Sequence, residues 1–130
     1  MIIDTSAYSA LQQGNSDVQN TFSGADVIIV PVIVIGELRY GFANGARPDE
    51  NEAVLQRFLA TEGVRLTDVT LDTTKVYAEL YMYARKNGKV LSFNDLWIAA
   101  LAKQLHMPLL TLDKDFEVLR PQLPAGLLLI

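Results

Sequence analysis

Short apolar segments without polar alternation recur along this chain and limit the folds it can adopt. Four of them can be read directly: Met1–Ile3, Val27–Val30, Leu109–Leu112 and Leu127–Ile130. A strand is apolar at consecutive positions when both of its faces are covered, as in a parallel sheet flanked by helices. The segment Val64–Val69 alternates more and is expected to be a fifth strand nearer an edge. We therefore expect a central, mainly parallel sheet of four to five strands.

Helical patterns occupy the intervals between these segments. They are Val32–Asn44 after Pro31, Asp49–Leu59 after Pro48, Thr73–Asn87 before Gly88, and Asn94–His106 before Pro108. Proline near the start of a helix, and glycine or proline past its end, are typical helix boundaries. Strands that alternate with helices form βαβ units, so the expected fold class is α/β, with three layers in the order α/β/α. The length of 130 residues suits one domain that spans residues 1–130.

Composition excludes several classes of function. The chain has no cysteine, which removes disulfide frameworks, cysteine-ligated zinc, iron–sulfur clusters and thiol nucleophiles. Its 11 Lys and Arg against 15 Asp and Glu give a net charge of −4, which argues against a histone-like nucleic-acid binder. No apolar run approaches the roughly 20 residues that span a bilayer. The start, MIIDTS, has no signal-peptide pattern, so we expect a cytoplasmic protein without a membrane span.

Four acidic residues are expected near the carboxyl ends of the strands, where open α/β sheets bind ligands. Asp4 and Asp113 directly follow apolar segments, Glu37 lies about two turns into a helix, and Asp95 opens the helix pattern NDLWIAALA. Taken singly, Asp4, Asp95 and Asp113 could serve only as helix caps, which are worth about 0.3 to 1 kcal/mol in interaction with the helix dipole. Glu37 resists that interpretation, because a carboxylate inside the apolar sequence VPVIVIGEL is costly without a partner.

Converging carboxylates need a positive partner. Two of them repel by about 4 kcal/mol at roughly 4 Å and an effective dielectric constant near 20. A few such contacts rival the whole stability of a domain, about 5 to 15 kcal/mol. Hard divalent cations such as Mg²⁺ or Mn²⁺ are the natural partners of an all-oxygen site, and they activate water for attack on phosphodiesters. The pattern therefore predicts metal-dependent phosphodiester hydrolysis, with the metal supplying the positive charge that this acidic chain lacks.

The acids stand in the segments MIIDTSA, VIGELRYG, LSFNDLWIAALA and LLTLDKDF, which resemble those of PIN-domain proteins. More narrowly, they resemble VapC-type toxin ribonucleases of type II toxin–antitoxin systems, from Met1 to about Phe116 and in family order. The resemblance implies a Mg²⁺ or Mn²⁺ site formed by three near-invariant acids and a more variable fourth: Asp4, Glu37, Asp95 and Asp113. Asp115 lies in the same motif as Asp113 and is kept as the alternate or a neighbouring group.

The same resemblance implies an activity and partners. These are endonucleolytic cleavage of RNA, inhibition by a VapB-type antitoxin whose C-terminal segment lies across the acidic pocket, and a homodimer. Thr5, Ser6 and Thr111 match small hydroxyl positions beside the acids, where they could hold a water or a carboxylate, or serve equally well as turn and cap hydroxyls. The candidate RNA contacts are four basic residues: Arg39, Arg85, Lys86 and Lys89. The last three surround the end of a predicted helix, where they could instead complement the helix dipole.

Two other functions fit parts of the pattern. A non-catalytic module could use the acidic pocket to capture a basic partner peptide. A receiver-like phosphoacceptor domain would have two adjacent acids after its first strand, whereas Asp4 is followed by Thr5. A Ser-His-Asp mechanism would depend on His106, which is expected at a helix end as a cap or surface residue.

Overall fold

Five parallel strands form the centre of the computed structural model, which describes residues 1–130. All neighbouring strands pair in parallel in the order β3-β2-β1-β4-β5. This confirms the expected sheet, and Val64–Thr67 is an edge strand as its alternation predicted. The strands are β1 (Ile2–Ile3), β2 (Ile28–Pro31), β3 (Val64–Thr67), β4 (Leu109–Thr111) and β5 (Leu127–Leu129).

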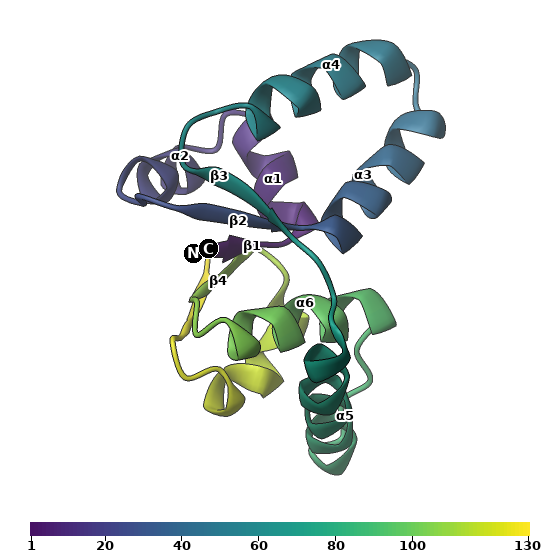
Figure 1. The fold of residues 1–130 in the computed structure, drawn as a ribbon, viewed down its shortest axis with the longest axis vertical. Coiled ribbons are helices and arrows are strands. Elements are labelled where there is room, and N and C mark those ends of the chain that lie inside the picture. The colour runs from purple at the N-terminus through teal and green to yellow at the C-terminus, as the bar shows by residue number, and fades with distance from the viewer.

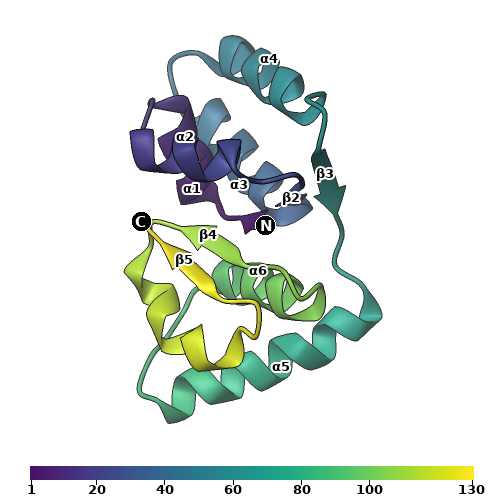
Figure 2. The same ribbon diagram turned by 90° about the vertical axis from the view of Figure 1, so that its left-hand side faces the viewer.

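Helices cover both faces of this sheet. The four that the sequence predicted end within about two residues of the expected positions: α3 (Val32–Ala43), α4 (Pro48–Leu59), α5 (Leu71–Lys86) and α6 (Phe93–Gln104). Three more were not predicted: α1 (Thr5–Gln12), α2 (Ser16–Ser23) and the 3₁₀ helix η1 (Lys114–Gln122). Figures 1 and 2 show α1 to α4 on one side of the sheet and α5, α6 and η1 on the other, so the predicted three-layer α/β/α fold is confirmed.

The strand order places a switch point between the central strand, β1, and its neighbour β4. The chain builds the sheet outward from β1 through β2 to β3, and then returns to add β4 and β5 on the other side. In such sheets the ligand crevice lies at the carboxyl ends of the strands where the direction of building changes. That point is the β1–β4 pair, in which Ile3 lies opposite Leu110. The order also differs from the 2-1-3-4-5 order of receiver-like domains.

The core explains why the strands are apolar at consecutive positions. Ile2 and Ile3 of β1, and Leu109 and Leu110 of β4, are all fully buried, because helices cover both faces of the sheet. Helix α6 buries nearly every residue from Leu96 to Ala102, which accounts for its apolar composition. None of the helices is both long enough and apolar enough to cross a membrane.

Candidate metal centre

Asp4 is the most enclosed of the four predicted acids. It follows β1 directly, caps α1, and is only 4% exposed. Its Oδ1 accepts a hydrogen bond from the Ala7 amide at 2.9 Å and from the Ser6 hydroxyl at 2.7 Å, and its Oδ2 accepts one from Thr111 at 2.6 Å. Asp4 therefore both caps α1 and lies at the switch point of the sheet.

The hydroxyl groups of Ser6 and Thr111 link the ends of β1 and β4. Ser6 Oγ accepts a hydrogen bond from the Leu112 amide at 2.9 Å, and Thr111 Oγ1 accepts one from the Asp113 amide at 2.9 Å. Each hydroxyl thus donates to the Asp4 carboxylate and accepts from the backbone of the β4 loop. These bonds hold the Asp4 carboxylate in one orientation relative to the residue that precedes η1.

Glu37 lies on the helix that follows β2. Its Oε1 accepts a hydrogen bond from the Thr5 hydroxyl at 2.9 Å, and Thr5 is the first residue of α1. The bond joins α3 to the end of β1, immediately after Asp4. Glu37 is half-buried, and this hydroxyl is its hydrogen-bond partner in the structure.

Asp95 enters from the opposite layer, in the first turn of α6. Ser92 caps that helix by accepting a hydrogen bond from the Asp95 amide at 3.1 Å. Burial raises the pKa of Asp95 to about 6, the neighbouring Ser92 hydroxyl lowers it, and the charges of Asp113, Glu37 and Asp4 raise it further. Burial is also the main reason that the pKa of Asp4 is raised, with a smaller contribution from Asp113.

These electrostatic couplings show that the structure brings the four acids into one neighbourhood. Each of the other three carboxylates raises the pKa of Asp95. The side chains do not, however, form a ready-made ligand shell: no group of three or more His, Asp or Glu side chains is close enough together to hold a metal ion. The four predicted acids therefore lie in one neighbourhood, but their side chains stay further apart than metal ligands do.

Asp113 and Asp115 differ clearly in their surroundings. Asp113 caps η1 by accepting a hydrogen bond from the Asp115 amide at 2.8 Å, and its charge acts on both Asp4 and Asp95. Asp115 is exposed and forms an ion pair with Lys89 at 2.7 Å. Of the two, Asp113 is thus the one electrostatically coupled to the other acids.

The predicted cations lie outside the acidic cluster. Arg39 is on a different face of α3 from Glu37 and forms an ion pair with Glu52 of α4 at 2.7 Å. Arg85 and Lys86 are exposed in the last turn of α5, where they complement the helix dipole. Lys89 is the one that approaches the site, through its ion pair with Asp115. Exposed ion pairs of this kind contribute little to stability, so they leave the cations available to other anions.

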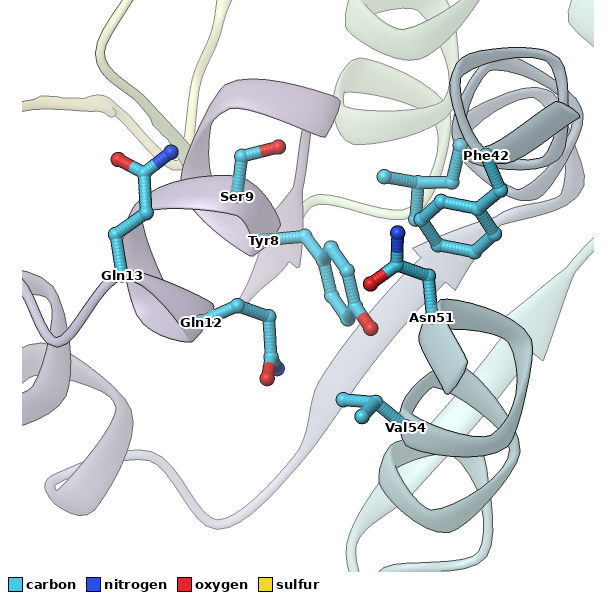
Figure 3. A pocket seen from close by; sticks show the side chains of 8 residues that line it. Tyr8, Ser9, Gln12, Gln13, Phe42, Asn51 and Val54 are labelled. Carbon is cyan, nitrogen blue, oxygen red and sulfur yellow. The ribbon is translucent and has the colours of Figure 1, made fainter. Parts of the chain in front are cut away.

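Three cavities border helix α3, and only one of them is lined by a predicted acid. That cavity, about 530 Å³, is lined by Glu37 together with Thr5, Ile33, Gly36, Tyr40 and Asn94. Tyr40 and Asn94 were not among the predicted site residues. The three-residue spacing from Glu37 to Tyr40 is the signal that places those two side chains on one face of the helix. Figure 3 shows another of these cavities, about 330 Å³, which α1, α3 and α4 line without any acidic side chain.

Comparison with known proteins places this fold and its acids in a family. Residues 1–120 match the PIN domain. The chain belongs to the PIN-domain family. All four acids, Thr5, Ser6, Thr111 and Asp115 fall inside the matched region.

Relatives of this PIN domain are named as toxins and ribonucleases. Ribonuclease VapC5 of Mycobacterium tuberculosis is 28% identical over 118 residues, which cover 91% of this chain and 86% of that protein. The crystal structure of VapBC-5 from Mycobacterium tuberculosis, a member of the VapBC family of toxin–antitoxin systems, superposes with a TM-score of 0.75 at 25% identity over 99% of this chain and 97% of the other. VapBC2 from Rickettsia felis, solved bound to a DNA fragment from its promoter, shares the fold with a TM-score of 0.81. The two chains are 24% identical, and the match covers 98% of this chain and 95% of the other. The resemblance to VapC-type proteins is thereby confirmed.

Proposed function

We propose that this PIN domain is a VapC-type toxin: a cytoplasmic, Mg²⁺- or Mn²⁺-dependent endoribonuclease that hydrolyses RNA phosphodiester bonds. The observation that carries the proposal is the neighbourhood of Asp4, Glu37, Asp95 and Asp113 near the switch point, where burial and the other three charges raise the pKa of Asp95 to about 6. A divalent cation would relieve this repulsion, and the four acids would offer it carboxylate oxygens, the ligands that Mg²⁺ and Mn²⁺ prefer. The relatives named as ribonucleases support the same activity.

The chain's own residues hold the acids for this chemistry. When bound, the metal would supply the charge that polarises the scissile phosphate and activates water. Ser6 and Thr111 fix the Asp4 carboxylate, and Thr5 fixes Glu37, so two ligands are oriented from the ends of α1 and β4. Asp95 and Asp113 complete the set from α6 and from the start of η1, and the coupling of Asp113 to Asp4 and Asp95 supports it over Asp115 as the fourth ligand.

We further propose that a VapB-type antitoxin neutralises the toxin and that the toxin itself forms a homodimer. The structural relatives support the first point, since they are VapBC toxin–antitoxin assemblies. The acidic cluster is a suitable target for a basic segment of an antitoxin, because it carries uncompensated negative charge. Exposed apolar side chains on α5 support the second point.

Cleavage of total cellular RNA by the purified, antitoxin-free protein tests the activity. We expect cleavage with Mg²⁺ or Mn²⁺, none with EDTA, and none from Asp95→Asn, which controls for a contaminating nuclease. Folded protein that binds metal and leaves every RNA intact would contradict the nuclease and favour the non-catalytic pocket for a basic peptide. Incorporation of phosphate from acetyl phosphate would instead favour a receiver-like domain, whose strand order this sheet does not have.

A further inference from the structure

The cavity beside Glu37 is formed mainly by one face of helix α3. Ile33, Gly36, Glu37 and Tyr40 follow each other at spacings of three, one and three residues, and so share a face. Thr5 and Asn94 close the cavity from α1 and from the first turn of α6. Its volume of about 530 Å³ is in the range of small-ligand sites. Glu37 therefore belongs both to the candidate metal centre and to the wall of this cavity.

Tyr40 is the unusual member of this wall. Its side chain is 75% exposed and takes part in none of the aromatic pairs of the molecule. Other tyrosines are used for packing: Tyr8 is 2% exposed, and Tyr77 stacks on Trp97 with ring centroids 3.9 Å apart. The fold does not need the Tyr40 ring, which leaves a flat aromatic surface free one helical turn from Glu37.

Gly36 points to the same use of the cavity. Glycine is a poor residue for a helix interior, yet Gly36 lies in the middle of α3. A Cβ added there would meet no protein atom within 4 Å, so the protein's own packing does not require glycine. Glycine is the usual residue where a backbone must approach a ligand closely. The missing side chain keeps the cavity wall open beside Glu37 and one turn from Tyr40.

We propose that this cavity binds a nucleoside of single-stranded RNA next to the scissile phosphate, with its base stacked on Tyr40. The proposal rests on the nuclease function proposed above. Single-stranded RNA is commonly recognised by bases stacked on aromatic side chains, and such stacking tolerates any base. No cation lines the cavity, so it is suited to a base and ribose rather than to phosphate. Gly36 gives the nucleoside room, and the Asn94 amide offers hydrogen bonds to a base edge or to the 2′-hydroxyl.

Binding without cleavage tests the proposal. In an Asp95→Asn background with Mg²⁺ present, fluorescence anisotropy measures the affinity for oligoadenylate and for an abasic ribose-phosphate oligomer of the same length. We expect Tyr40→Leu to weaken oligoadenylate binding by roughly 5- to 100-fold. Tyr40→Phe keeps the ring and should bind as the parent does. The abasic oligomer should be insensitive to both changes, because it has no base to stack.

Two glycines of α3 provide a matched pair. Gly36→Ala should weaken oligoadenylate binding and raise the melting temperature, because alanine favours the helix while its methyl group enters the cavity. A Cβ added at Gly41 also meets no atom within 4 Å, but Gly41 does not line the cavity, so Gly41→Ala is the control. It should raise the melting temperature and leave binding unchanged. Equal effects of the two variants on binding would contradict a role for Gly36.

The outcomes separate this proposal from the proposed function. If the wild-type protein cleaves RNA but Tyr40→Leu binds oligoadenylate as tightly as its parent, the stacking site is wrong and the nuclease stands. If Tyr40→Leu weakens binding of the abasic oligomer as much as binding of oligoadenylate, the ring contacts the ribose-phosphate backbone and the proposed base stacking is wrong. If the wild-type protein with both metals cleaves no RNA, the nuclease itself is wrong.

Discussion

The fold opposes the ionisation of Asp95, and this makes the stability of the protein depend on pH. Its pKa is raised to about 6 from the value of 3.8, mainly by burial and then by the other carboxylates. An acid with a raised pKa binds its proton more tightly in the folded protein than in the unfolded chain. It therefore supports stability below about pH 4, and this contribution is lost as the pH rises through about 6. Without metal, the ionised Asp95 destabilises the protein at neutral pH.

Replacing this carboxylate should stabilise the metal-free protein. In EDTA near neutral pH, we expect Asp95→Asn to raise the free energy of unfolding by about 1 to 3 kcal/mol, since two pKa units correspond to at most about that much. The gain should shrink toward zero near pH 4, where wild-type Asp95 is protonated. Thermal melts at both pH values measure the difference. Asp115→Asn, which alters an exposed ion pair, should change little and is the control. A variant less stable than wild type at neutral pH would contradict this account.

The positions of the acids could be predicted from their neighbours in the sequence, but their side-chain partners could not. Asp4 and Asp113 follow short apolar segments that are typical of buried strands, which predicted both at the carboxyl edge of the sheet. The ion pair of Lys89 with Asp115 joins residues brought together only by tertiary folding. The orientation of Asp4 likewise depends on a hydroxyl more than one hundred positions away in the chain, that of Thr111. Local patterns carry no information about such contacts.

The helices that border the site end in two related ways. At the end of α5, Gly88 has φ +72°, and the next amide, that of Lys89, donates to Ala84 O at 3.0 Å. At the end of α6, His106 has φ +51°, and the Met107 amide donates to Ala102 O at 3.0 Å. Both are Schellman motifs, in which glycine is the favoured residue at the left-handed position. Histidine there costs backbone strain that glycine avoids.

This comparison predicts opposite effects at the two helix ends. His106→Gly should raise the free energy of unfolding by about 0.5 to 1 kcal/mol, and Gly88→Ala should lower it by about 1 kcal/mol. Urea denaturation of both variants measures these changes. The Cβ added at Gly88 meets no atom within 4 Å, so its effect would come from the backbone alone. Destabilisation by His106→Gly would show that the imidazole has a structural role beyond the cap.

Long, well-bounded helices were predicted correctly, and short ones were missed for identifiable reasons. Helices α3 to α6 carry clear proline or glycine boundaries and apolar spacing. Helix α1 has only eight residues and begins with Thr5 and Ser6, which indicate a turn as readily as a helix. The 3₁₀ helix η1 contains Pro121, and a proline inside a segment argues against predicting a helix there. Its buried Phe116 and Leu119 are what hold it in place.

The proposed homodimer concerns the outer surface of the molecule. Helix α5 forms the outer edge of its layer (Figure 2), and it exposes 82% of Leu71 and 52% of Met82. These two residues lie about three turns apart and so share a face. We expect Met82→Glu to shift the protein from dimer to monomer in sedimentation equilibrium without lowering its melting temperature. A wild-type monomer, or a variant that dimerises as wild type does, would contradict α5 as the interface.

Binding of Mn²⁺ to the purified protein, measured by titration calorimetry, tests the central claim most directly. If Asp4, Glu37, Asp95 and Asp113 form one metal centre, the wild-type protein should bind Mn²⁺, and Asp95→Asn and Asp113→Asn should each bind at least about tenfold more weakly, since removing a charged ligand costs more than about 1.4 kcal/mol. Asp115→Asn should bind as wild type does. Unchanged Mn²⁺ affinity in Asp95→Asn, or loss of binding in Asp115→Asn alone, would contradict the assignment.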